Sequence, residues 1–82
     1  MSVIIEKART AFYESGSIVL QMSGGAEYRF PVSANSKLAK GSPKQLNNIE
    51  ISPFGLHWPD LDEDLSIRGI MEGDFGQAGS GR

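Results

Sequence analysis

The sequence has no cysteine, only one tryptophan and one histidine, and no long apolar run. Without cysteine, the chain can form neither a disulfide framework nor a thiolate metal site or nucleophile. Its longest apolar runs, such as Val3 to Ile5, fall far short of the roughly 18 residues that a membrane span needs. No basic segment followed by an apolar core marks a signal peptide at the N-terminus. These absences predict a cytoplasmic protein that does not act in a membrane.

The composition predicts one small globular domain. Of the 82 residues, 39% are hydrophobic and 22% are charged, values typical of soluble folded proteins. A chain this short buries only about 60–65% of the surface of its unfolded form, which limits its stability. Since no disulfide or cysteine-held metal compensates, a homo-oligomer or a bound partner becomes more plausible than usual.

Acidic residues are scarce in the first part of the chain and abundant in the second. Residues 1–49 carry six basic against three acidic side chains, a net charge of +3, whereas residues 50–82 carry two against seven, a net of −5. A protein that binds nucleic acid by itself needs a basic face, so the overall net charge of −2 argues against that function. An acidic surface suits a basic protein partner, or it is simply solvated.

Alternation of apolar residues predicts a three-stranded antiparallel meander in the first half. Residues 8–13 are good strand formers, residues 14–17 make a turn, and residues 18–22 are the clearest strand. After Gly24-Gly25 the chain returns as a strand that Pro31 ends or confines to an edge.

The register of this meander follows from its side chains. Pairing Leu20 with Tyr28 and Ile18 with Phe30 keeps the apolar residues on one face, whereas a one-residue slip would turn them over. This pairing leaves a three-residue loop, 23–25, and we expect Gly25 to be left-handed there.

Two short helices are expected. Ser42 and Gln45 form a capping box around Pro43 at the first helical position, which predicts a helix over residues 43–48. Before it, residues 33–42 are polar, with one helical turn expected around Leu38. Ser66 is the expected cap of the last helix, which Gly73 would end in a left-handed conformation.

The segment 55–66, GLHWPDLDEDLS, organises the rest of the chain. Residues 56–58 are predicted to be a short strand that ends at Pro59, with Leu56 and Trp58 on one face and His57 on the other. An acidic loop, 60–64, is expected to follow. The residues assigned to the structural core of this motif are Trp58, which would close the open side of the meander, and Pro59, Leu61 and Leu65.

The acids of this segment fit metal chemistry poorly. Asp60, Asp62 and Asp64 fall at positions 1, 3 and 5 of a possible calcium loop, but Leu65 and Met71 stand where that loop needs Gly and Glu. Metal-dependent hydrolysis would require His57 as a base and the neighbouring carboxylates as metal ligands. Transition-metal sites usually contain more imidazole or thiolate ligands, and the chain has no second histidine. We therefore predict no metal, no cofactor and no catalytic residue. In the structural alternative, one or two of the carboxylates cap the last helix or accept backbone N–H groups, and His57 is a half-exposed strand residue bonded to a neighbouring carboxylate or carbonyl.

Five segments together resemble an uncharacterised bacterial family, a domain of unknown function with the signature G-(I/L)-H-W-P-x-(L/I)-D-E-D-(L/I)-S. They are residues 29–33, 37–39, 42–46, 55–66 and 67–71, and the resemblance runs from Ala8 to Gly73. Where the family usually has Asp-Gly at the hairpin turn, this chain has Gly24-Gly25. The resemblance implies an α+β fold on a small antiparallel sheet. Some longer relatives carry a C-terminal helix-turn-helix, and such genes can neighbour another short gene, as toxin–antitoxin or regulator pairs do.

Together these observations predict a single α+β domain over residues 1–73, a β-meander of three strands plus a short fourth with two short helices, and a flexible Gly-rich tail over residues 74–82. The expected function is a non-enzymatic protein-binding or regulatory module, in one form the antitoxin-like member of a two-gene pair. Alternatives are an accessory dimerisation domain of a transcription regulator and, ranked lower, a metal-dependent hydrolase. The expected partner-binding residues are His57, Asp60, Asp62, Glu63 and Asp64.

Overall fold

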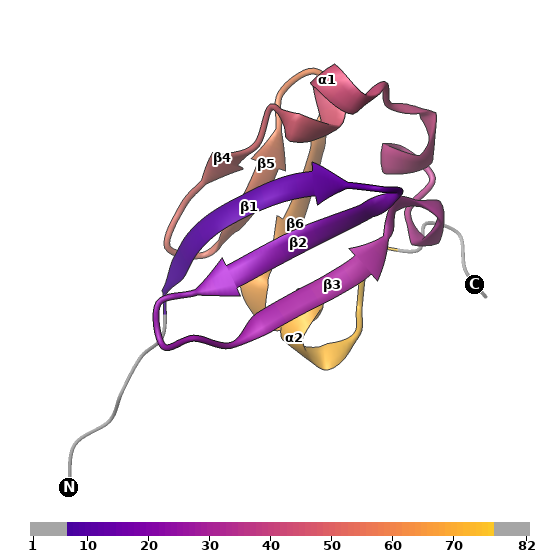
Figure 1. Ribbon diagram of the computed structural model, residues 1–82. Helices are drawn as coiled ribbons and strands as arrows, with labels where there is room; N and C mark the ends of the chain where they lie inside the picture. Colours follow the sequence, from indigo (N-terminus) through magenta and orange to yellow (C-terminus); the bar gives the residue numbers. More distant parts are fainter. Residues whose placement is uncertain (1–6, 77–82) are drawn as a thin grey trace, which may run out of the picture.

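The computed structural model describes residues 7–76, which form two three-stranded antiparallel sheets and two short helices (Figure 1). The first sheet has the order β1-β2-β3 and the second the order β4-β5-β6. The elements are β1 (Ala8–Glu14), β2 (Ser17–Met22), β3 (Glu27–Pro31), the 3-10 turns η1 (Val32–Ala34) and η2 (Leu38–Lys40), α1 (Pro43–Asn47), β4 (Glu50–Ile51), β5 (Gly55–Trp58), β6 (Glu63–Ser66) and α2 (Ile67–Glu72). The predicted α+β class is confirmed.

The first sheet is the predicted meander, in the predicted register. Ile18 pairs with Phe30 and Leu20 with Tyr28, so the three-residue loop 23–25 is confirmed. Gly25 has φ +104°, a left-handed conformation that a residue with a Cβ adopts only with strain. The tighter β1–β2 turn consists of Ser15 and Gly16, both with positive φ, as the twist of a two-residue hairpin requires.

The segment between the sheets also follows its local sequence signals. β3 is an outer strand and ends at Pro31, and the expected helical turn at Leu38 is η2. In α1, the Ser42 hydroxyl accepts from the Gln45 amide and the Gln45 side chain accepts from the Ser42 amide, so the predicted capping box is present.

The second sheet contains a strand that was not expected. Glu63–Ser66, predicted to be mostly loop, is β6 and pairs with β5 along its whole length. The intervening turn closes through a hydrogen bond from the Leu61 amide to the Trp58 carbonyl (3.1 Å), and Asp62 adopts a left-handed φ of +52°. Consecutive acids are poor strand formers, but pairing with an already anchored strand overrides that preference. The predicted short strand is β5, and together with β4 and the unexpected β6 it forms a complete second sheet.

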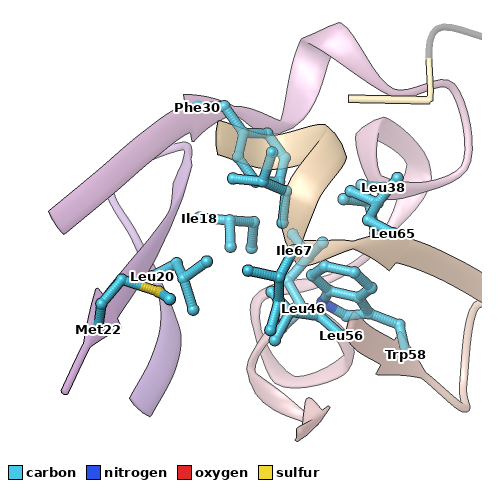
Figure 2. Packing of buried hydrophobic residues seen from close by; sticks show 11 residues of the cluster. Ile18, Leu20, Met22, Phe30, Leu38, Leu46, Leu56, Trp58, Leu65 and Ile67 are labelled. Atoms are coloured by element: carbon cyan, nitrogen blue, oxygen red, sulfur yellow. Dashed lines mark hydrogen bonds between the residues drawn. The ribbon is translucent and has the colours of Figure 1, made fainter. Parts of the chain in front are cut away.

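The hydrophobic core lies between the two sheets, and α1 and α2 lie at opposite ends of it (Figure 1). Figure 2 shows side chains of the first sheet, including Ile18 and Phe30, directed toward Leu56, Trp58 and Ile67. Trp58 is fully buried, which confirms its predicted role as a core residue. Of the last helix, Ile67 and Ile70 are buried, while Gly73 caps its end with φ +88° as expected.

Packing continues beyond Gly73, where the tail was predicted to begin. The Phe75 ring stacks on the buried Phe30 ring, with centroids 4.6 Å apart and planes within 9°. The rest of that predicted tail, residues 77–82, lies outside the described residues, as do residues 1–6. In the part of the chain that is described, none of the helices combines the length and apolar character needed to cross a bilayer.

Candidate functional site

The outer face of the second sheet carries a row of three polar side chains, one from each strand. Glu50 of β4 pairs with His57 of β5, and His57 pairs with Asp64 of β6. Directly paired residues project to the same face of a sheet, and the buried Leu56 and Leu65 occupy the opposite face. The row therefore faces away from the core, toward solvent.

His57 and Asp64 are in direct contact within this row. The His57 Nδ1 atom lies 2.5 Å from Asp64 Oδ1, and the two side chains remain 38% and 78% exposed. This confirms the expectation that His57 is a half-exposed strand residue bonded to a neighbouring carboxylate or carbonyl, and the structure identifies the partner as the Asp64 carboxylate. A polar contact this open to water contributes only about 0–1 kcal/mol to stability. Its main effect is to hold the imidazole in one orientation on the surface.

Two further acids lie at the β5–β6 turn beside this row. The Asn48 side chain donates to Asp60 Oδ2 at 3.0 Å, and the Lys37 ammonium donates to the Asp62 backbone carbonyl at 2.8 Å. Both aspartates are exposed. We call Glu50, His57 and Asp64, together with Asp60 and Asp62 of the turn, the acidic face.

Glu63 is the one predicted partner-binding residue that the structure places elsewhere. It pairs with Trp58, so alternation directs its side chain to the inner face of the sheet. There its Oε2 atom accepts a hydrogen bond from the side chain of Asn35 at 2.5 Å. The partly buried Glu63 carboxylate therefore has a structural partner within the protein and lies apart from the acidic face.

Asn35 is a residue of structural importance that the sequence did not single out. It is fully buried, and its Oδ1 atom accepts from the amides of Lys37 and Leu38, both at 3.0 Å. Its Nδ2 group donates to Glu63 and to the carbonyl of Phe75 at 2.8 Å. An asparagine two or three residues before a helical turn is a local capping signal, but only the fold shows what its Nδ2 group meets.

The core residues of the motif support this face from behind. The Trp58 indole nitrogen donates to the Leu46 carbonyl at 3.1 Å, which ties β5 to α1. Leu65 is buried, and Leu61 is half-buried and packs close to Gly41. Pro59 was also predicted to belong to the core of the motif, but it is exposed at the start of the turn, because it directly follows the inward-facing Trp58. The acidic face is thus mounted on a packed sheet, which limits its motion.

The carboxylates of this region do not converge. Asp60, Glu63 and Asp64 each contact a different neighbour, and within residues 7–76 no three His, Cys, Asp or Glu side chains are arranged to hold a metal ion. The same residues form no pocket. The arrangement presents exposed carboxylates and one half-exposed imidazole on the outer side of a packed sheet.

The fold and much of the sequence are shared with known proteins. A family model described as "Protein of unknown function (DUF2442)" matches residues 8–76. The crystal structure of a protein of unknown function from Rhodospirillum rubrum is 33% identical, with a TM-score of 0.81 over 95% of this chain and 98% of that one. The solution structure of an uncharacterized protein from Chromobacterium violaceum is also 33% identical, with a TM-score of 0.76 over 88% and 70%. The curated proteins contain no match.

Proposed function

The chain belongs to the DUF2442 family of proteins of unknown function. From the geometry of its acidic face, we propose that it is a small, non-enzymatic protein-binding module whose acidic face meets a basic protein partner. The observation that carries this proposal is the in-register row of Glu50, His57 and Asp64 on the solvent side of the second sheet. The aspartates of the adjoining turn extend the same charge.

Electrostatics supports a basic partner. Residues 50–82 have a net charge of −5, and the acidic face lies within that part of the chain. Complementary charge speeds the encounter of two proteins and disfavours partners of the wrong sign. The rigid sheet beneath the face adds to affinity because little ordering has to accompany binding. In this proposal the protein acts in the cytoplasm, and the product of a neighbouring gene, as in an antitoxin-like pair, is the first partner to test.

Co-expression with the product of the adjacent gene, followed by size-exclusion chromatography, tests the proposal. We expect the two proteins to elute together and the complex to weaken as salt is raised. The double variant Glu50→Gln/Asp64→Asn should weaken it further, while Glu14→Gln/Glu27→Gln removes the same charge from the other sheet and should not. Equal effects of the two double variants would show that net charge, and not this face, mediates binding.

A second candidate, an accessory domain that dimerises through a sheet edge, is favoured by the position of β3 at the edge of the first sheet. However, β3 carries Glu27, Arg29 and Pro31, and charged residues and proline on an edge strand discourage edge-to-edge pairing. We therefore rank it second. A concentration-dependent dimer that Arg29→Ala or Glu27→Ala strengthens would favour it over the acidic-face proposal.

A further inference from the structure

The last described residues, 74–76, form a C-terminal strap that is bound to the body of the protein. The Phe75 ring stacks on Phe30, which is only 1% exposed. The Asn35 Nδ2 group donates to the carbonyl of Phe75 at 2.8 Å and lies 3.4 Å from that of Gly76. Asn35 therefore recognises the strap through its backbone, while the ring stack provides the apolar contact.

Gly76 fits this site closely. Its φ is +70°, and a Cβ at that position would lie 2.8 Å from the end of the Leu65 side chain and 2.9 Å from Asn35 Nδ2. A Cβ at this position would be strained by the positive φ and would require the ends of the Leu65 and Asn35 side chains to shift. A side chain at position 76 would therefore disturb the contact between the strap and Asn35.

The same Asn35 amide group also bonds to the sheet that carries the acidic face. It donates to Glu63 Oε2, and Glu63 Oε1 in turn accepts from the Asp64 amide at 3.2 Å. A continuous chain of hydrogen bonds therefore runs from the strap through Asn35 and Glu63 to Asp64, the residue that contacts His57.

Detachment of the strap would leave an N–H of a buried amide without its partner. Once the strap leaves, this N–H has to bond to water or the Asn35 side chain has to reorient, and either change alters the surroundings of the Glu63 carboxylate that shares the same amide group. After the exposed end of α2, residues 75 and 76 are held to the body of the protein by the Phe75 ring stack and by the Asn35 side chain, so local opening here breaks few contacts. Release of the strap would therefore give the Glu63 carboxylate different surroundings.

We propose that the strap is a conformational switch, coupled through Asn35 and Glu63 to the acidic face. A binding event that withdraws Phe75 from Phe30 alters β6, and by thermodynamic reciprocity an event that repositions β6 alters the docking of the strap. This coupling is a property of the fold and does not depend on which partner the acidic face binds.

NMR spectroscopy and native-state hydrogen exchange on the full chain test this coupling. The Phe75→Ala variant removes the stack, and Phe54→Ala is its matched control because Phe54 is 83% exposed on the β4–β5 turn. With Phe75→Ala we expect exchange of the Leu38 amide, which donates to Asn35, to rise roughly tenfold, about the effect of one unpaired buried donor. Signals of Glu63 and Asp64 should shift, while exchange of the Met22 amide in the first sheet stays unchanged.

Gly76→Ala is the second variant, because it displaces the strap without removing an aromatic ring. It should reproduce the changes at Leu38, Glu63 and Asp64, and Phe54→Ala should cause none of them. Equal acceleration at Leu38 and Met22 in both strap variants would show general destabilisation and overturn the proposal. Unshifted Glu63 and Asp64 signals in a variant whose strap is released would overturn it as well.

Discussion

The indole nitrogen of Trp58 donates a hydrogen bond to the backbone carbonyl of Leu46, 3.1 Å away in the buried core. One side chain thereby fills the space between the sheets and satisfies a carbonyl of a helix only five residues long. A helix this short cannot pair its own last carbonyls, so the bond from Trp58 replaces a missing intrahelical partner.

Trp58→Phe should destabilise the protein by about 3 kcal/mol, because it leaves a cavity and an unpaired buried carbonyl. The free energy of unfolding, measured by urea denaturation, checks this value. The control Phe54→Ala changes a ring that is 83% exposed and should stay within about 0.5 kcal/mol of the unaltered chain. If the Trp58→Phe variant keeps the free energy of unfolding of the unaltered chain, the indole N–H is not needed for stability.

Gly25→Ala should destabilise the β2–β3 hairpin by about 1–2 kcal/mol, because a Cβ is strained at φ +104°. The neighbouring Gly24 does not have a positive φ, so Gly24→Ala is the matched control and should cost little. Thermal unfolding of the two variants gives the comparison. Similar losses in both would argue against the three-residue loop geometry.

Ser42→Ala should lower the free energy of unfolding by about 1 kcal/mol, since it removes the acceptor for the Gln45 amide at the start of α1. Ser36→Ala, in the exposed loop before η2, is the control and should be nearly neutral. The difference between the two variants in chemical denaturation measures the contribution of the cap. If Ser36→Ala costs as much, the capping box does not stabilise this helix.

Asp64→Asn should change stability by less than about 1 kcal/mol, because its contact with His57 is open to water. Its effect should instead appear as a slower association with a basic partner, most clearly at low salt. Stopped-flow or surface-based kinetics can measure the association rate, with Glu27→Gln as the control on the first sheet. A large loss of stability in Asp64→Asn would identify the pair as structural.

Features encoded by neighbouring residues were predictable from the sequence. The hairpin register follows from the alternation of Ile18, Leu20, Tyr28 and Phe30, and the capping box at Ser42 depends on residues three positions apart. The placement of His57 opposite to Leu56 and Trp58 likewise required only the two-residue period of a strand.

The candidate site was predicted less completely. Of the expected partner-binding residues, His57 is half-exposed and Asp60, Asp62 and Asp64 are exposed, whereas Glu63 turns inward because residues 63–66 form a strand. Four acids in five residues resemble a loop, and the strand forms because β5 offers a paired edge backed by the core. Glu50 was missed because its place beside His57 depends on pairing between β4 and β5.

The sequence by itself determined the meander, the two capped helices, the burial of Trp58 and the acidic character of the second half, because each depends on composition or on residues a few positions apart. Only the tertiary structure decided the second sheet, the split of Glu63 from Asp64, and the joining of Asn35 to Phe75 across 40 positions. The physical reason is that buried polar groups must find partners. Which partner lies within hydrogen-bond reach is set by how the sheets pack, and local sequence does not specify that packing.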